Sequence, residues 1–223
     1  QSIGMKALLL FGTPEQKERW LPRCATGELV SAFALTEPGS GSDAAGMKTV
    51  GRRAPDGQGW ILNGRKQWIT NGGYADLVTV FARTPVEGDG KTEEKITCFM
   101  VERTAPGFSS GQPEKKLGIR GSSTTDILLE ETPVPDFNVV GEVGRGFKVA
   151  MEVLNTGRLT LASGSVGGTK EMIRVALAHA EQRRQFGQPI IEFEMVEEKF
   201  AEMAVNLYAM EAMTYLTTGL CDA

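Results

Sequence analysis

Histidine and cysteine are both scarce in this sequence. Its 223 residues include one histidine, His179, and three widely separated cysteines, Cys24, Cys98 and Cys221. A single imidazole cannot form a histidine-based zinc site and makes a Ser-His-Asp triad a poor explanation, while the cysteine spacing matches no zinc motif or disulfide framework. The sequence therefore predicts no metal site, and any chemistry must come from carboxylates, hydroxyls or a bound cofactor.

Long apolar runs and an excess of positive charge are also absent. No run reaches the ~18 apolar residues that a membrane-spanning helix needs, so we expect no transmembrane segment. The formal net charge is −4 with a pI near 5.3, whereas nucleic-acid binding needs a surplus of Lys and Arg. Cysteines whose spacing matches no disulfide framework suit a reducing compartment. We therefore expect a soluble intracellular protein that does not bind nucleic acid.

The hydrophobic pattern divides the chain into three parts. Residues 1–30 carry helical signals, with Thr13 as an N-cap and Pro14 at the first helical position. Residues 31–140 change to a period of two, and residues 141–223 return to a helical period with two long helices. The predicted fold class is multi-domain α+β: the end of a helical domain, a β-domain, and the first half of a four-helix bundle.

The middle part contains six or seven short strand-like runs joined by turns. Turn signals include Asn63-Gly64 and Asn71-Gly72, each between two runs with strand periodicity. Since no helical pattern separates the strands, the sequence predicts an antiparallel barrel or sandwich. On the second long helix, the residues Val196, Phe200, Met203, Leu207, Met210 and Thr214 form a stripe that we expect to pack on partner helices.

The stretch from Ala34 to Gly46, ALTEPGSGSDAAG, has the G-x-G-x-x-G/A spacing of a Rossmann dinucleotide site. That site needs a following helix and an acidic residue about 20 positions later. Glycines interrupt the expected helix, and no acidic residue lies between positions 56 and 76. The spacing therefore does not predict a Rossmann fold. Thr36 and Ser42 still offer hydroxyls, and an ordinary turn and an anion-binding loop remain equal alternatives.

A second segment, GRKQWITNGG, favours ligand binding. Trp68 and Thr70 lie two residues apart on a predicted strand, so their side chains face the same side. An aromatic ring beside a hydroxyl offers a planar heterocycle a stacking surface and a hydrogen bond. Trp68 as an ordinary core residue remains the alternative when it is considered alone. The two segments together are more specific than either one.

Several motifs in order resemble the flavin-dependent acyl-CoA dehydrogenases. They are FALTEPGSGSDAAGMKT, ILNGRKQWITNGG, EKKLGIRGSSTTDI, VPDFNVVGEVGRGFKVAMEVLNTGR and RRQFGQPI. The resemblance covers essentially the whole chain and is closest to the very-long-chain branch. It implies the end of an N-terminal helical domain (1–30), a middle β-domain (31–140) and two helices of an incomplete C-terminal bundle (141–223). We expect the chain to be truncated at both ends.

The resemblance also implies FAD as cofactor and assigns residues to it. The cofactor-binding residues would be Phe33, Leu35, Thr36, Gly41, Ser42, Trp68, Ile69 and Thr70, with Arg183, Gln185 and Phe186 reaching the FAD of a neighbouring subunit. Ser42, Ser122, Asn155 and Arg158 would bind the fatty acyl-CoA. A homodimer or homotetramer is therefore implied.

The implied reaction is α,β-dehydrogenation of a long-chain fatty acyl-CoA to trans-2-enoyl-CoA, a step of fatty acid β-oxidation. A carboxylate removes the α-proton, a hydride passes to flavin N5, and the electrons continue to an electron-transfer flavoprotein. The catalytic glutamate is expected beyond Ala223, and the position that some branches use instead is Gly157 here. No catalytic residue is therefore assigned in this chain.

The resemblance leaves other roles and a choice of location open. The same scaffold serves acyl-CoA oxidases, flavin hydroxylases and proteins with a non-enzymatic role in assembling respiratory complexes. The implied location is the bacterial cytoplasm or the mitochondrial matrix, with association to the inner membrane as an option.

Overall fold

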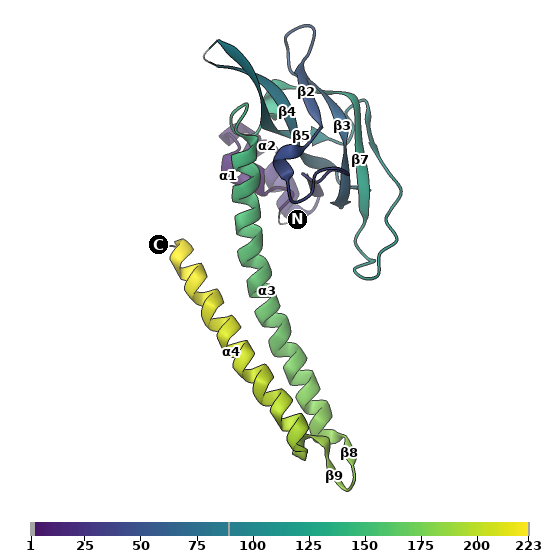
Figure 1. Ribbon diagram of the computed structural model, residues 1–223. Coiled ribbons are helices and arrows are strands. Elements are labelled where there is room, and N and C mark those ends of the chain that lie inside the picture. Colours follow the sequence, from purple (N-terminus) through teal and green to yellow (C-terminus); the bar gives the residue numbers. More distant parts are fainter. Residues whose placement is uncertain (1–2, 89, 223) are drawn as a thin grey trace. The chain divides into compact units, whose positions relative to one another are not determined.

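The computed structural model describes residues 3–88 and 90–222 (Figure 1). The chain forms two compact units, Gln1–Leu154 and Asn155–Ala223. The three-part domain division expected from the sequence stays a prediction, and the expected base beyond Ala223 lies outside the described residues. Across the described part of the chain, no helix combines the length and apolar content needed to cross a membrane.

Two short helices precede the sheet of the first unit, α1 (Lys6–Phe11) and α2 (Pro14–Thr26). Thr13 caps α2 as predicted. Its hydroxyl accepts a hydrogen bond from the Gln16 backbone N–H at 3.2 Å, and the Gln16 side-chain oxygen accepts one from the Thr13 N–H at 2.9 Å. This reciprocal arrangement is a capping box. Gln16 also donates from Nε2 to the Phe137 carbonyl oxygen at 2.5 Å, which fastens α2 to the segment that follows the sheet.

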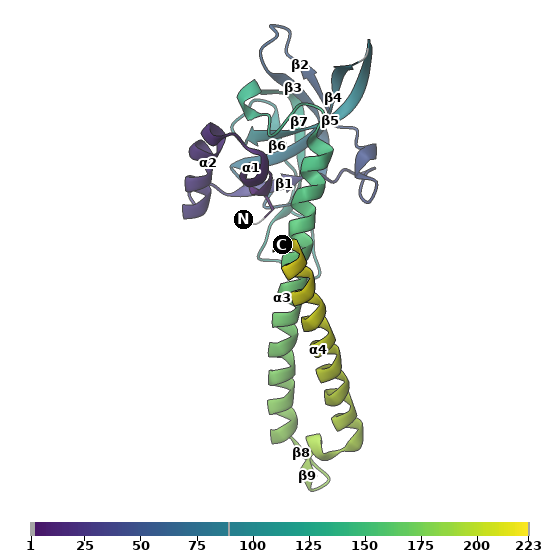
Figure 2. The ribbon, with the colours of Figure 1, turned by 90° about the vertical axis from the view of Figure 1, so that its left-hand side faces the viewer.

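A seven-stranded sheet forms the centre of this unit (Figure 2). Its strands are β1 (Ser31–Ala34), β2 (Val50–Arg53), β3 (Trp60–Thr70), β4 (Leu77–Gly88), β5 (Lys91–Glu102), β6 (Phe108–Ser110) and β7 (Thr124–Val134). The order is β1-β4-β2-β3-β7-β6, and β5 pairs with β4. Most pairs are antiparallel, as predicted, but β4 runs parallel to both β1 and β2. Both parallel pairs join strands that are not consecutive in the sequence, because parallel strands need a longer connection than a hairpin turn.

One of the two predicted Asn-Gly turns is present. Asn71 has a φ of 66° and begins the turn between β3 and β4, as expected. Asn63 and Gly64 instead lie within β3, at a register shift opposite β7. A Cβ at Gly64 would come within 2.3 Å of the Thr49 hydroxyl oxygen. The turn prediction at Asn63-Gly64 is therefore wrong, because this glycine makes room for a neighbouring segment rather than for a hairpin.

Two hydrophobic clusters contain residues of the sheet. One hydrophobic cluster contains Phe81 of β4, Trp20 of α2 and Val153, near the start of helix α3 (Gly146–Gln182). The other includes Trp60 and Phe99, whose rings meet edge to face with centroids 5.7 Å apart. The sheet is therefore a rigid frame for the segments at its edges.

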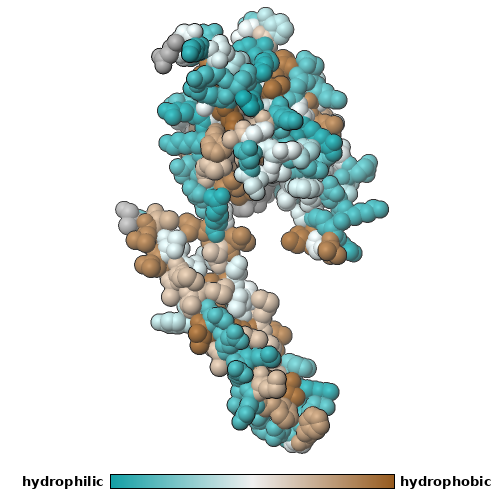
Figure 3. Space-filling model, in the orientation of Figure 1, coloured by the Kyte–Doolittle hydropathy of each residue, from teal (hydrophilic) through white to brown (hydrophobic). Residues whose placement is uncertain are grey.

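The second unit confirms the two predicted long helices. α3 continues to Gln182, a small hairpin of β8 (Arg184–Gln185) and β9 (Gln188–Pro189) follows, and α4 spans Glu194–Asp222. The stripe predicted on α4 is half-buried except for Met203. Brown and tan areas in Figure 3 mark hydrophobic surface on the two helices. Other large side chains that stay exposed there include Leu161, Met172, Val205, Tyr208, Tyr215 and Leu216. The partner helices of the predicted bundle would cover such a surface.

Candidate functional site

A cleft of about 490 Å³ lies where β1 and the loop after it meet the end of β3. Its lining consists of Ile3, Gly4, Ser31, Ala32, Phe33, Leu35, Thr36, Gly41, Trp68, Ile69, Thr70, Asn71 and Leu154. The residues predicted to bind FAD within the first unit number eight, and all of them except Ser42 are in this lining. The structure therefore brings together two segments that the sequence analysis linked only by motif.

Contacts within the protein fix the position of both segments. The Gln67 N–H donates to the Thr36 carbonyl oxygen at 2.8 Å, which ties the loop after β1 to β3. The Asn71 side-chain amide donates to the Ser31 carbonyl oxygen at 3.2 Å. Phe33 packs edge-on against Phe81, with ring centroids 5.2 Å apart. The walls of the cleft are therefore preformed by the sheet and its core.

Trp68 has an unusual backbone conformation. Its φ is 58°, and β3 has one more residue than β7 between Lys66 and Ile69, which makes a β-bulge. A left-handed φ at a bulky residue costs about 1–3 kcal/mol, and such strain is typical of binding sites. Trp68 is 60% exposed and Thr70 is also exposed, whereas Ile69 between them is buried. Trp68 and Thr70 therefore face the same side, as predicted, and the alternative of Trp68 as a core residue is wrong.

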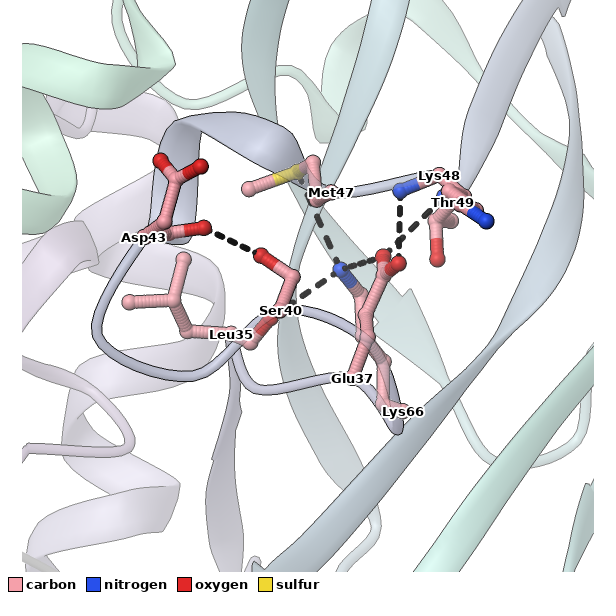
Figure 4. Close-up of polar contacts among 8 residues, drawn as sticks. All are labelled: Leu35, Glu37, Ser40, Asp43, Met47, Lys48, Thr49 and Lys66. Atoms are coloured by element: carbon pink, nitrogen blue, oxygen red, sulfur yellow. Dashed lines mark hydrogen bonds and ion pairs between the residues drawn. The ribbon is translucent and has the colours of Figure 1, made fainter.

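A buried ion pair that the sequence analysis missed anchors the loop (Figure 4). Lys66 Nζ lies 2.8 Å from Glu37 Oε1 and donates to the Leu35 carbonyl oxygen at 3.2 Å. The Glu37 carboxylate also accepts from the backbone N–H groups of Lys48 and Thr49, at 2.6 and 3.0 Å. The pair therefore joins the beginning and the end of this loop to β3 and sets the position of the cleft wall.

Burial and pairing shift the pKa of both charged groups. Burial lowers the pKa of Lys66 to about 8, although the Glu37 carboxylate opposes this decrease. Burial alone would raise the pKa of Glu37, but the Lys66 cation and the hydrogen bonds to the carboxylate outweigh it and hold the pKa below 4.5. Both groups are therefore charged near neutral pH.

Acid is expected to destabilise the protein partly through Glu37. The pKa of Glu37 is lower in the folded than in the unfolded state. The stability that the Glu37 carboxylate contributes is therefore fully present above pH 4.5 and is lost as the pH falls through the folded pKa. Urea unfolding between about pH 3 and pH 6 should show a weaker pH dependence for Glu37→Gln than for the wild type. An equal slope for the two proteins would contradict the charged role of Glu37.

The glycines of the loop are not followed by the helix that a Rossmann turn requires, which agrees with the sequence prediction. Only a single 3₁₀ turn, Ala44–Gly46, follows them before β2 begins. Apart from the adjoining residues, no heavy atom of residues 3–88 and 90–222 lies within 4 Å of a Cβ placed at Gly39 or Gly41, so packing within this part of the protein does not explain either glycine. Gly41 lines the cleft, and close approach of an occupant would explain its lack of a side chain.

The other predicted site residues lie outside this cleft. Ser42 is exposed on the loop, and Ser122 lines a separate pocket. In the second unit, Arg158 Nη1 donates to Asn155 Oδ1 at 2.6 Å. The three residues assigned to a neighbouring subunit's FAD are exposed at or beside the β8–β9 hairpin: Arg183, Gln185 and Phe186, the last 95% exposed. Their roles stay predictions.

Known sequences agree with the motifs. The family descriptions "Acyl-CoA dehydrogenase, N-terminal domain", "middle domain" and "C-terminal domain" match residues 1–28, 32–132 and 144–223. The very long-chain specific acyl-CoA dehydrogenase, mitochondrial, of Homo sapiens is 49% identical over 224 residues, which is 100% of this chain and 34% of that protein.

Solved structures are similar along nearly the whole chain. An acyl-CoA dehydrogenase complexed with FAD from Bacillus anthracis has a TM-score of 0.91 and 46% identity, over 98% of this chain and 36% of that one. Butyryl-CoA dehydrogenase from Megasphaera elsdenii has a TM-score of 0.87 and 37% identity, over 96% of this chain and 55% of that one. The chain therefore spans between one third and just over half of these relatives. Its sequence and fold both place it in the acyl-CoA dehydrogenase family.

Proposed function

We propose that the protein containing this chain is an FAD-dependent acyl-CoA dehydrogenase that oxidises long-chain fatty acyl-CoA thioesters. The gathering of the predicted flavin contacts around one cleft carries this proposal. The name of the human relative, which specifies very long chains, supports the substrate class. The solved relative described as an FAD complex supports the cofactor.

The cleft has the chemistry that a flavin ring system requires. Phe33, Leu35 and Trp68 present apolar and aromatic surface to a planar ring, and the hydroxyls of Thr36 and Thr70 can hydrogen-bond to its polar edges. A bound flavin would accept the hydride that leaves the substrate. These residues would hold the ring, fix its orientation and shield it from water.

Groups outside the cleft complete the proposed activity. The α C–H of a thioester is weakly acidic, so fixed donors must polarise the carbonyl while a carboxylate takes the proton. We assign that carboxylate to the part of the protein after this chain. An electron-transfer flavoprotein would receive the electrons, and a homo-oligomer would bring the exposed Phe186 to a neighbouring subunit. Bacterial and mitochondrial relatives agree with a location in the cytoplasm or the matrix.

Replacing Trp68 with alanine tests the cleft. Loss of an aromatic contact worth about 0.5–1.5 kcal/mol should weaken FAD binding about 2- to 12-fold. The stability of the deflavinated protein should change little, because the Trp68 side chain is 60% exposed. FAD fluorescence titration measures the affinity, and palmitoyl-CoA-dependent dye reduction measures the activity.

A second aromatic residue of the same unit supplies the control. Phe137 is 40% exposed and lies outside the cleft lining, so Phe137→Ala should leave the FAD affinity unchanged. Unaltered FAD binding in Trp68→Ala would contradict the assignment of the cleft. Hydrogen peroxide formation by the wild type in place of dye reduction would indicate an acyl-CoA oxidase instead.

A further inference from the structure

The ammonium of Lys66 is a charged group in the interior of the first unit. Its side chain is fully buried on β3. Its Nζ contacts Glu37 Oε1 at 2.8 Å, the Leu35 carbonyl oxygen at 3.2 Å and Met47 Sδ at 3.9 Å. All three neighbours belong to the segment between β1 and β2, residues 35–49 (Figure 4). One side chain therefore ties the beginning and the end of this segment to β3.

The contacts of Lys66 adjoin both walls of the cleft. Leu35 and Thr36 form part of one wall, and residues 68–70, which follow Lys66 along β3, form part of the other. The N–H of Gln67, the next residue after Lys66, donates to the Thr36 carbonyl oxygen at 2.8 Å. The separation of the two walls therefore depends on contacts that two consecutive residues of β3 make.

Loss of the ammonium charge would weaken these contacts. A neutral amine is a poorer donor to the Leu35 carbonyl and the Glu37 carboxylate, because charge-assisted hydrogen bonds are about twice as strong as neutral ones. Glu37, which is 5% exposed, would remain as a buried charge whose cation is lost. A movement of Glu37 toward water would relieve this cost, and Leu35 and Thr36 would move with it.

We propose that the charge of Lys66 positions the flavin-binding wall, so that FAD binds tightly only while this charge is present, an inference that rests on the proposed function. Lys66 is a positioning residue, because it contacts the wall and is not itself in the cleft lining. Burial lowers the pKa of Lys66 to about 8, so its charge is lost under mildly alkaline conditions. The FAD affinity should therefore be constant near neutral pH and weaken above about pH 8.

The other charged groups around Lys66 do not give the same response. Glu37 is the carboxylate bonded to it, and the pKa of that carboxylate stays below 4.5. The residue opposite Lys66 on β7 is the apolar Ile127. Arg65 and Asp126, the residues that precede these two, pair with each other on the other face of the strands. A titration near pH 8 therefore reports Lys66.

The same titration has the opposite effect on global stability. The pKa of Lys66 is about 8 in the folded protein and 10.5 when the side chain is free in water, so the unfolded chain binds more protons between these two values. The contribution of Lys66 to the free energy of unfolding therefore rises over this interval. Weaker FAD binding without a loss of stability of the deflavinated protein would indicate a local change in the wall.

Calorimetry of FAD binding to the deflavinated wild type measures the linked proton. Binding should take up about one proton per FAD at about pH 9 and almost none at about pH 7, because FAD selects the charged form of Lys66. Titrations in buffers of different ionisation enthalpy give this number. The Kd for FAD should rise by up to about tenfold per pH unit above the pKa of Lys66. A constant Kd from about pH 7 to about pH 9.5 would overturn the proposal.

Two variants should move this response in opposite directions. Lys66→Arg keeps a cation that does not titrate, so the proton uptake and the alkaline loss of affinity should both disappear. Glu37→Gln removes the carboxylate that opposes the decrease in the pKa of Lys66, so both effects should appear below about pH 8. If Lys66→Arg does not fold, the direction of the Glu37→Gln shift still decides the test. Lys95→Arg, in an exposed ion pair on β5, is the matched control and should titrate like the wild type.

Hydrogen exchange in the deflavinated protein separates failure of this proposal from failure of the proposed function. The Gln67 N–H reports the wall directly, because it bonds to Thr36. Its protection factor should decline above about pH 8 in the wild type and stay constant in Lys66→Arg. If the protein binds no FAD, the proposed function is wrong, and this decline would still support control of the wall by Lys66. A constant protection factor in the wild type, with FAD bound equally well at every pH, would overturn the positioning role alone.

Discussion

Replacement of Lys66 with methionine is expected to destabilise the protein by about 3–5 kcal/mol, the usual cost of removing one member of a buried ion pair. Glu37 is 5% exposed and would lose the only cation paired with it in the described residues, at 2.8 Å. The N–H groups of Lys48 and Thr49 would still bond to the carboxylate but would not neutralise it. Urea unfolding of the two proteins near neutral pH measures the difference.

Two further variants define what the Lys66 result means. Lys95 forms an exposed ion pair with Glu93 at 3.0 Å, so Lys95→Met should cost less than about 1 kcal/mol. Glu37→Gln combined with Lys66→Met should recover part of the loss, because it removes the uncompensated charge. A loss for Lys66→Met no greater than for Lys95→Met would show that the buried pair does not hold the loop.

Valine in place of Gly41 is expected to weaken FAD binding about 5- to 150-fold, from an overpacking cost of about 1–3 kcal/mol. The residue lines the cleft, so the new side chain would take space from the cofactor. The deflavinated protein should keep its stability, because among the described residues only the two adjoining ones can lie within 4 Å of a Cβ at this position. FAD titration and thermal unfolding of the deflavinated protein provide the two measurements.

Gly39 is the matched control for Gly41. It lies in the same loop, and a Cβ there would also meet no described residue within 4 Å other than its two neighbours, but it is not in the cleft lining. Gly39→Val should therefore retain the FAD affinity of the wild type. Equal losses in the two variants would mean that valine alters the conformation of the loop rather than the space in the cleft.

Local patterns predicted those parts of the fold that local interactions determine. Thr13 and Pro14 predicted the start of α2, and helical periodicity predicted α3 and α4. The prediction of a turn at Asn63-Gly64 failed because the glycine is needed for a different reason. Thr49, from another segment, lies where a side chain at Gly64 would be. The parallel pairing of β4 with β1 and β2 could not be predicted from the sequence either, because strand-like runs alone do not specify which strands become neighbours.

In the candidate site too, the sequence predicted features that depend on local structure and missed those that depend on contacts between distant segments. The common orientation of Trp68 and Thr70 followed from the period of two along a strand, whereas the positive φ of Trp68 depends on a bulge against β7. Lys66 was missed because lysine is usually exposed. Lys66 lies four positions after the apolar Leu62, and this even spacing on a strand places both side chains on the same, buried face. Its partner Glu37 is 29 positions away in the sequence and becomes a neighbour only through the fold.

The pairing of β1 with β4 has a consequence for the order of folding. β4 and β5 adjoin in the sequence and form a local hairpin, whereas Ser31 of β1 lies opposite Leu77 and Trp60 of β3 lies opposite Val134. Closing longer loops costs more chain entropy, so distant pairs tend to form after local ones. The walls of the cleft come from β1, which pairs with distant β4, and from β3, which pairs with its neighbour β2 and with distant β7. We therefore expect the binding surface to be complete only late in folding, when the cofactor can stabilise the native state but cannot guide the first steps.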